Sequence, residues 1–484
     1  EVWCIMGNGV YLSRSQSSSE DSTARKKFTI SGWYKLADNG DAGGWKGFWS
    51  AAVDSNNYSS LKQNADGYII FEQKSSGTGV TWTSSGRYRD YCSWYHIVVA
   101  YDSAQASNTD RVKVYINGEQ AAGTYGSFTQ DQEGFWGNSS ATAGVGRYNN
   151  NTGNSYMYTG YMTHVVCTIG YALAPTVFGE TDSTTGMWKV RGAPSGITYS
   201  ANGFFLKFEN SGTMGTDSSG NNNTFTVNGV GGSDGSLVQV TDVPDNNFAT
   251  INPVDVGRNF DQMEISEGSL RGTSSGTTTS NGDQLASSIG FAKGKWYWEI
   301  KLLSSADSLF IGVFNDVLGG RAPYHDNYGY FFYGDGTGSH SQIYQSQEGG
   351  QRGYGTDSNP CFSNNDICQV AFDCDNYRLY IGKNGLWTDD NAAGGGSITS
   401  GSAFNQSTPT GYYQISTAAA QAGFYRAGVV KAGSSVQFST QFNFGNPQFT
   451  IASSNSDANG HGSFEYAVPS GFYALCTKNL NTYG

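Results

Sequence analysis

Two consecutive runs decide the fold of this chain: Trp94-Tyr95-His96-Ile97-Val98-Val99-Ala100-Tyr101, and then Arg111-Val112-Lys113-Val114-Tyr115-Ile116-Asn117-Gly118. Both are rich in the β-branched and aromatic residues that strands prefer, and the second ends at a Gly turn. A second group of the same kind follows at residues 294–301, 309–313 and 377–385. Neither group carries a catalytic constellation. The sequence therefore predicts two β-sandwiches with recognition or structural roles.

Length and composition agree with this interpretation. The chain has 484 residues, which predicts two domains of roughly 200 residues each. Glycine is the commonest residue at 66, aromatic residues reach 14%, and charged residues also reach only 14%. Low charge with many aromatic and small polar residues suits half-exposed strands and polar turns rather than exposed helices. We therefore expect an all-β protein of two antiparallel jelly-roll sandwiches joined by an irregular connector.

The charge balance excludes several classes of partner. The net charge is −12 and no block of Lys or Arg occurs, so neither nucleic acid nor an anionic membrane surface is an expected partner. No apolar run approaches the roughly 20 residues that cross a bilayer, so membrane insertion is not expected. The chain opens at Glu1 without Met or a signal peptide. This predicts a processed product or an internal part of a longer protein.

Seven cysteines are spaced irregularly, and no C-x-x-C pair occurs. Cys368 alternates in phase with Val370 and Phe372, which is typical of a small buried residue on the core face of a strand. Cys167 follows the same pattern. Buried thiols are therefore predicted rather than a zinc site or a disulfide framework, in keeping with assembly in a reducing cytosol.

The order of motifs in the first half is specific. In sequence these are an aromatic strand at 28–34, the run at 94–102, the hairpin at 112–118, and glycine-containing strands at 143–147 and 158–162. This order resembles that of a laminin-G-like (concanavalin-type) jelly roll, here assigned to residues 1–181. In that fold two antiparallel sheets pack face to face.

The second half and the join extend the resemblance. The join, assigned to residues 182–258, is identified by segments at 171–188, 202–208, 216–223 and 247–253. Residues 259–484 resemble a SPRY-like β-sandwich, through motifs at 296–300, 311–313, 328–333, 370–373, 436–445 and 464–472. The whole string is similar to virion proteins of tailed bacteriophages of the marine type. In relatives the exit at 464–472 often leads to further domains, so Gly484 is expected to be an internal cut.

The resemblance implies a role. It implies a virion structural protein, either a tail fibre or a capsid-surface appendage, that adheres to host surface glycan. Its expected partners are other virion proteins and the host glycan, with a homo-oligomeric state. It would be assembled in the host cytoplasm and displayed on the virion surface. Two alternatives remain: an architectural capsid decoration protein without sugar binding, and a secreted bacterial lectin or adhesin.

No catalytic residues are predicted. A glycanase needs two carboxylates flanking the scissile bond, and laminarinase-type relatives supply them from a Glu-x-Asp-x-x-Glu strand that is missing here. The nearest pair is Glu264 and Glu267, which we interpret as a solvated edge. The five histidines have no metal spacing, and His96 and His164 are expected to be hydrogen-bonded structural residues. We therefore predict a non-enzyme, with a depolymerase as the enzyme alternative.

Two sets of residues remain as candidate ligand sites. Aromatic rings on loops bind the apolar faces of sugars, so a loop of the second domain supplies the candidates Tyr324, His325, Tyr328 and Tyr354. The alternative is that they only pack that loop. Oxygen-bearing side chains at 217–223 form a turn of a composition that could hold a structural calcium ion. The spacing is not that of an EF-hand, and a Gly/Asn turn explains it equally well. No other cofactor is expected.

Overall fold

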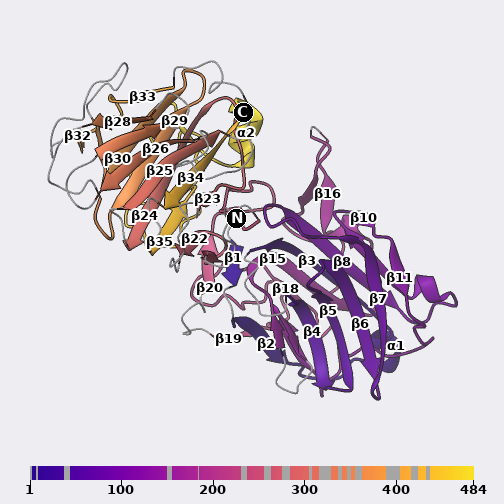
Figure 1. The fold of residues 1–484 in the computed structure, drawn as a ribbon. Helices are drawn as coiled ribbons and strands as arrows, with labels where there is room; N and C mark the ends of the chain where they lie inside the picture. The colour runs from indigo at the N-terminus through magenta and orange to yellow at the C-terminus, as the bar shows by residue number, and fades with distance from the viewer. Residues whose placement is uncertain are drawn as a thin grey trace. The chain divides into compact units, whose positions relative to one another are not determined.

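The computed structural model describes residues 3–6, 9–37, 44–149, 155–183, 185–229, 237–254, 263–274, 284–304, 308–315, 329–335, 341–345, 350–354, 362–388, 404–415, 423–431 and 437–484. These residues divide into two compact units, unit 1 (1–245) and unit 2 (246–484). Antiparallel strands dominate both (Figure 1), and the two α-helices, α1 (Ser22–Arg25) and α2 (Thr477–Tyr483), are short. Among these residues no helix is long and apolar enough to span a bilayer. The all-β prediction is confirmed.

The first sheet of unit 1 has eight strands among the described residues. Its order is β10 (Glu119–Gln120), β9 (Val112–Ile116), β8 (Trp94–Asp102), β3 (Lys27–Leu36), β15 (Gly160–Ile169), β1 (Trp3–Met6) and β20 (Leu237–Val240), with β18 (Phe204–Leu206) paired to β15. The two runs that decided the fold are thus β8 and β9, which pair antiparallel with Val99 opposite Val114. That prediction is confirmed.

The second sheet of unit 1 also has eight described strands. Its order is β11 (Gly123–Tyr125), β7 (Thr78–Arg87), β6 (Tyr68–Ser75), β5 (Asn57–Gln63), β4 (Lys46–Asp54), β12 (Thr142–Val145), β2 (Tyr11–Ser15) and β19 (Thr226–Asn228). Two short hairpins lie outside these sheets: β13 (Arg147–Asn149) with β14 (Ser155–Met157), and β16 (Gly179–Thr181) with β17 (Trp188–Val190).

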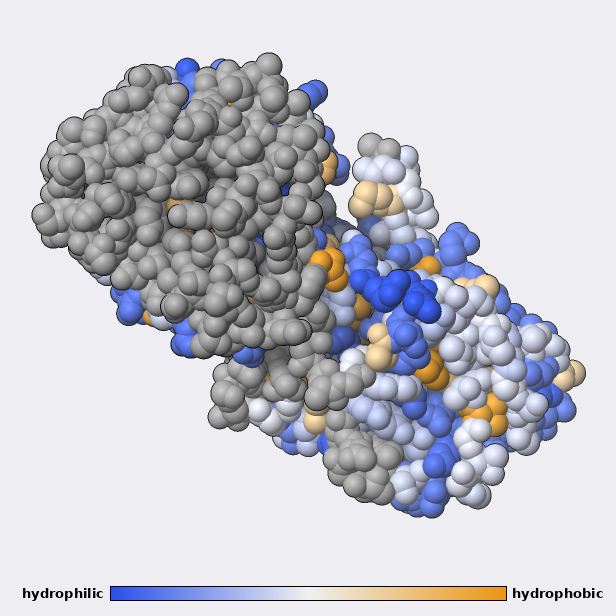
Figure 2. All heavy atoms as spheres, in the orientation of Figure 1, coloured by the Kyte–Doolittle hydropathy of each residue, from blue (hydrophilic) through white to orange (hydrophobic). Residues whose placement is uncertain are grey.

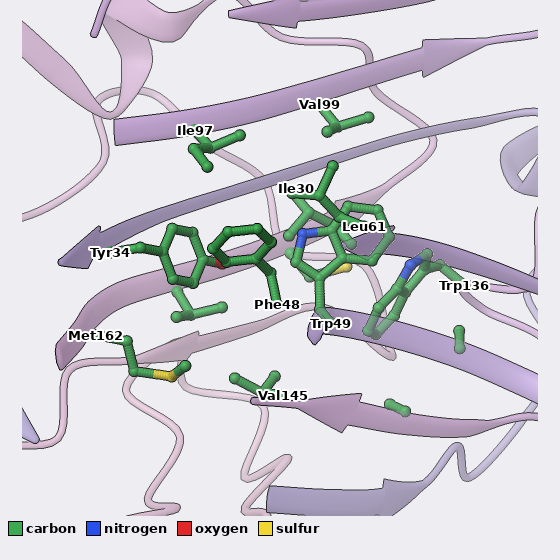
Figure 3. Packing of buried hydrophobic residues seen from close by; sticks show 14 of the residues in the cluster. Ile30, Tyr34, Phe48, Trp49, Leu61, Ile97, Val99, Trp136, Val145 and Met162 are labelled. Atoms are coloured by element: carbon green, nitrogen blue, oxygen red, sulfur yellow. The ribbon is translucent and has the colours of Figure 1, made fainter. Parts of the chain in front are cut away.

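The core of unit 1 fills the space between its two sheets with aromatic and aliphatic side chains (Figure 3). Trp49 and Trp136 meet edge to face at 5.9 Å, and Tyr34 meets Phe48 at 4.7 Å in the same manner. Edge-to-face packing is a favoured arrangement of aromatic quadrupoles. Strand alternation supplies this core, because each strand of the sandwich contributes every second residue.

Residues 182–245 belong to unit 1, whereas the sequence analysis assigned residues 182–258 to a connector between the two sandwiches. β18 and β20 extend the first sheet and β19 extends the second. The segment also helps to cover the outer face of the first sheet, where its Phe205 packs with Val98, Val166 and the preceding Phe178. As a result β3 and β15 are buried along nearly their whole length. The boundary between the units falls after residue 245 instead of spanning 182–258.

Unit 2 is built from two further sheets, which are antiparallel apart from one short parallel pair. The ten-stranded sheet contains β21 (Met263–Ser266), β22 (Arg271–Ser274), β35 (Phe438–Asn443), β24 (Lys295–Ser304), β29 (Ile367–Asp373), β30 (Arg378–Lys383), β31 (Leu386–Thr388) and β32 (Phe404–Gln406), with β33 (Tyr413–Gln414) on β30 and β36 (Tyr473–Ala474) on β24. The six-stranded sheet runs β23 (Gln284–Ala286), β34 (Tyr425–Lys431), β25 (Ser308–Asn315), β26 (Gly329–Asp335), β27 (Ser341–Gln345) and β28 (Gly350–Tyr354). These counts refer to the described strands. The predicted strands at 294–301, 309–313 and 377–385 correspond to β24, β25 and β30 with its turn.

An Asn-Gly turn closes one hairpin in each unit. Asn117 and Asn384 have φ values of 50° each, and the glycines that follow have φ of 87° and 90°. Two successive positive φ values match the twist of the flanking strands, and Asn-Gly tolerates them best. In each turn the Asn side-chain oxygen accepts a backbone N–H of the neighbouring strand, from His96 at 2.8 Å and from Ile367 at 2.9 Å. The two sandwiches thus use the same local device.

The beginning and the end of unit 2 are held together. Phe248 forms a bridge with Cys476, and Asn247 and Thr477 exchange hydrogen bonds. The returning C-terminal segment crosses β24, where the buried carboxylate of Glu299 accepts four hydrogen bonds. Its donors are Tyr297, Asn443 and the backbone N–H groups of residues 465 and 466. Residues 246–254, predicted as connector, are therefore part of this sandwich.

The first prediction concerns unit 1 expressed alone. Residues 1–245 should unfold in a single cooperative thermal transition, whereas residues 1–181 lack β18, β19 and β20 and leave the outer face of β3 and β15 uncovered. We expect the shorter fragment to aggregate or to melt at a clearly lower temperature, measured by circular dichroism. Equal melting temperatures for the two fragments would restore the connector interpretation.

Candidate functional site

Of the site residues predicted from the sequence, Tyr324, His325 and Tyr328 lie outside the described residues. Tyr354 ends β28, where its backbone is in register with Ser341, and its side chain also lies outside the described part. This site remains a prediction.

Unit 1 contains an open polar cleft of about 400 Å³. That volume lies within the usual range for ligand pockets. The cleft is lined by Asn57, Ser75, Thr129, Gln130, Asp131, Gln132, Glu133, Gly134, Phe135 and Asn138. Amide, hydroxyl and carboxylate groups therefore dominate the lining, with Phe135 as its single aromatic residue. Such a surface can donate to and accept from a ligand that carries many hydroxyl groups.

Buried polar side chains of the strands hold the loop that forms this cleft. Ser59 donates to Gln73 at 2.5 Å and accepts the backbone N–H of Phe135 at 3.2 Å. Gln73 in turn donates to the backbone oxygen of Glu133 at 3.2 Å. Both side chains occupy core-facing strand positions, where unpaired polar groups would be costly. They therefore fix one side of the loop on β5 and β6.

Gln16 holds the other side of the loop. Its side-chain amide donates to the backbone oxygens of Phe135 and Asn138, both at 2.9 Å, and its oxygen accepts the N–H of Gly137 at 2.6 Å. Gln16 is almost completely buried. The sequence interpretation missed this cleft. The sequence did contain one indication of the cleft. Polar residues occupy strand positions that the alternation of side chains assigns to the core.

The charges at the cleft are largely balanced. Asp131 pairs with Lys26 at 3.0 Å, and Glu133 pairs with Arg25 and accepts the Ser22 hydroxyl at 2.5 Å. Because the carboxylates of Asp131 and Glu133 each have a cation beside them, the cleft can bind a ligand through hydrogen bonds but has no strong net negative electrostatic potential. On the face of unit 1 that Figure 2 shows, hydrophilic and intermediate residues dominate and apolar residues are scattered.

An aromatic row lies on the second sheet of unit 1. Trp45 stacks on Tyr156 at 5.4 Å, Tyr156 stacks on Tyr148 at 5.6 Å, and Tyr148 donates a hydrogen bond to Tyr58 at 3.0 Å. The ammonium group of Lys62 lies 4.4 Å from the centre of the Tyr148 ring. Burial raises the pKa of both Tyr58 and Tyr148 above the usual value. These rings fasten the β13–β14 hairpin to the sheet, so the row is a packing element.

The buried histidines of unit 1 are structural, as predicted. His96 Nε2 lies 2.8 Å from the hydroxyl of Ser31, and Nδ1 accepts the indole N–H of Trp188 at 3.0 Å. Because Nδ1 accepts, the ring proton is on Nε2, so His96 cannot serve as a base toward Ser31. Burial lowers the pKa of His96 to about 3. His164, in an irregularity of β15, bonds Thr163 and Gly192, and burial lowers its pKa to about 4.

The carboxylates considered for catalysis do not form an acid–base pair. Glu264 is exposed on β21, as the solvated-edge interpretation predicts. Glu267 departs from that interpretation, because it is half-buried and binds Arg271 at 3.1 Å and Gln441 at 2.5 Å. Its carboxylate stabilises the turn between β21 and β22.

The Asn-rich turn at 217–223 uses its oxygens within the protein. Asp217 accepts hydrogen bonds from the backbone of Phe205, Ser219 and Asn223 and from the Ser219 hydroxyl, at 2.7–2.9 Å. Asn222 has a φ of 61°, and Asn221 donates to backbone oxygens. The Gly/Asn turn is therefore sufficient to explain these residues. Within the described ranges no group of three or more His, Cys, Asp or Glu is arranged to hold a metal ion.

One family model matches this chain. Residues 8–168 match the model described as the concanavalin A-like lectin/glucanases superfamily. This confirms the concanavalin-type sandwich expected for the first half. No curated protein matches the chain.

Solved structures with similarity include SPRY domains and a pentraxin. The SPRY domain of human HERC1 is 12% identical over 40% of this chain and 96% of that one. The TRIM65 PSpry domain is 13% identical over 40% and 92%. The heptameric SAP-like pentraxin from Limulus polyphemus is 16% identical over 36% and 78%. The TM-score is 0.26 for each of them.

The second prediction concerns the pH dependence of unit 1. The folded state protonates His96 only near pH 3, whereas an exposed histidine does so near 6.5. Between pH 6.5 and pH 3 the unfolded state therefore binds more protons than the folded state. The contribution of His96 to the free energy of unfolding is fully present above about pH 6.5 and is lost as the pH falls. One such histidine contributes up to about 1.4 kcal/mol per pH unit. Urea unfolding of residues 1–245 at pH 7.5, 6 and 5 measures it.

The matched variant for this test is His96→Gln, which keeps a hydrogen-bonding side chain but does not titrate. It should flatten part of the pH dependence, while His164→Gln should remove a second part. An unchanged slope in His96→Gln would contradict the assignment of a buried neutral imidazole.

Proposed function

We propose that the protein is a non-enzymatic adhesin that binds a glycan in the polar cleft of unit 1. The observation that carries this proposal is the lining of the cleft, in which amides, hydroxyls and carboxylates surround one aromatic ring. Sugar recognition needs many hydrogen bonds of fixed geometry. The cleft supplies them from a loop whose backbone is held by Gln16, Ser59 and Gln73. The concanavalin-type match of residues 8–168 supports a binding role.

The proposal includes a setting on a virus particle. The protein would be a structural component of a tailed-phage virion, in a tail fibre or capsid-surface appendage. It would be assembled in the host cytoplasm and displayed on the particle surface beside other virion proteins, as a homo-oligomer. The order of sequence motifs across both halves supports this setting. An architectural decoration protein and a secreted bacterial lectin are the competing assignments.

Absence of catalysis is part of the proposal. Among the described residues, the Ser31–His96 contact is buried, and His96 carries its proton on Nε2, the nitrogen that faces Ser31, so it cannot act as a base there. Glu267 forms an ion pair with Arg271 and accepts a hydrogen bond from Gln441. Neither arrangement supplies the acid and base that glycoside hydrolysis requires. Incubation with capsule or lipopolysaccharide should therefore release no reducing ends, and their release would establish the depolymerase alternative.

The third prediction tests the cleft. Gln130 is exposed and makes only one long hydrogen bond, to Ala104 at 3.5 Å, so Gln130→Ala should change stability by less than about 0.5 kcal/mol. It removes one ligand contact, which should weaken glycan binding by about threefold to tenfold. Gln120→Ala on β10 is the matched control, because Gln120 is also exposed and lies outside the cleft. The measurement is binding of residues 1–245 to a glycan array and to host cells.

Fragments 1–245 and 246–484 are assayed side by side. Binding by unit 1 that is weakened in Gln130→Ala and retained in Gln120→Ala supports the cleft. Binding by unit 2 alone, lost in Tyr324→Ala or His325→Ala, would move the site to the loop predicted from the sequence. Failure of both fragments and of the full chain to bind would favour the architectural alternative.

A further inference from the structure

One ion pair of unit 1 is unlike the others. The ammonium nitrogen of Lys35, on β3, lies 2.7 Å from Oδ2 of Asp242, and both side chains are 0% exposed. The next most enclosed of the ion pairs in the described part of the chain, Lys62–Glu72, has side chains that are 11% and 14% exposed. Burying an ammonium and a carboxylate together costs desolvation that their attraction only partly offsets.

Aromatic and aliphatic side chains enclose the pair. The Tyr161 ring centre is 5.1 Å from the Lys35 nitrogen, and Trp94 meets that ring edge to face. Trp33, Val190, Val240 and Val243 belong to the same buried cluster. The second carboxylate oxygen of Asp242, Oδ1, accepts the indole N–H of Trp94 at 2.9 Å. An amine, a carboxyl group and a hydrogen-bond donor to that carboxyl group are thus held together in a site closed to water.

We propose that Lys35 and Asp242 condense to an intramolecular amide, a self-formed covalent cross-link. One proton passes from the Lys35 ammonium to Oδ2, which converts the ion pair into an amine and a carboxylic acid. The amine nitrogen then attacks Cγ of Asp242, and the negative charge develops on Oδ1, where the Trp94 N–H stabilises it. A second nitrogen proton goes to Oδ2, the Cγ–Oδ2 bond breaks, and one water molecule leaves.

The burial of Lys35 and Asp242 favours formation of the amide and also protects the amide once it has formed. Held at hydrogen-bond distance, the groups react as an intramolecular pair, for which effective concentrations are high. The surrounding side chains keep water away from the product, which protects the amide from hydrolysis. The step consumes no oxidant, reductant or activated reagent, because the ammonium and carboxylate supply every atom of the released water.

The position of the cross-link suggests what it does. Lys35 belongs to β3, which lies between β8 and β15 in the first sheet, and Asp242 lies three residues before the end of unit 1. An amide between them would fasten the exit of unit 1 directly to an interior strand. A pulling force applied through the chain after residue 245 would then act directly on β3, and β20 and β1 would not have to separate from the sheet first.

The experiment is the intact mass of the full-length protein, purified and denatured. The proposal expects a mass lower than that of the sequence by one water molecule. It also expects a tryptic peptide in which cleavage after Lys35 is blocked and the segment with Asp242 is attached. Lys35→Arg and Asp242→Ala should each show the full sequence mass. Lys295→Arg is the matched control and should keep the loss of water, because Lys295 on β24 is 37% exposed in its pair with Asp373 of β29.

Either readout decides the matter. A wild-type protein with the full sequence mass after prolonged incubation in the folded state, and with normal cleavage after Lys35, would overturn the proposal and leave an ordinary buried ion pair. Since this test uses wild-type protein, it is valid even if both variants fail to fold. It is also independent of glycan binding.

Discussion

The outer face of β3 is buried, so each polar group on it must find a partner inside the protein. Thr29 donates to the backbone oxygen of Tyr171 at 2.8 Å and accepts the N–H of Leu173. Ser31 bonds His96, and Lys35 pairs with Asp242. Most of these partners come from the chain after residue 170. Besides extending both sheets with β18, β19 and β20, that segment therefore closes the outer face of the first sheet, where β3 carries polar groups that water cannot reach.

Unit 2 solves the same problem with its own final segment. Glu299 on β24 is buried, and its carboxylate is satisfied by side chains of the sheet and by backbone N–H groups of residues 465 and 466. Burial raises the pKa of this carboxyl group to about 7, against the effect of its four donors. Asp457 plays a comparable part, because it accepts N–H groups of Asn459, His461 and Ala474 and the Asn479 amide. In both units a late segment is fixed by a few buried polar residues, such as Lys35 and Glu299 of the sheets and Asp457 within the segment itself.

Much of the fold was predictable because it depends on local pattern. The alternation and the Gly turns of 94–118 and of 294–313 predict β8, β9, β24 and β25. The role of 182–245 was not predictable, because β18 and β19 are only three residues long and their partners lie far away in sequence. The cleft was not predicted for a similar reason. The roles of Gln16, Ser59 and Gln73 become recognisable only when the structure places the loop at 129–138 beside them. Tyr324, His325 and Tyr328 remain predictions from residue type alone.

Hydrogen–deuterium exchange of the full chain tests most directly whether the segment after residue 170 is integral to unit 1. If the buried polar groups of β3 hold this segment in place, backbone amides of β18 and β20 should exchange in the same cooperative opening as those of β3 and β15. Their exchange rates should also depend on denaturant concentration to the same extent. Rapid exchange of residues 200–206 and 237–243 while β3 stays protected would show that the segment opens independently of the sheet, and would contradict the account.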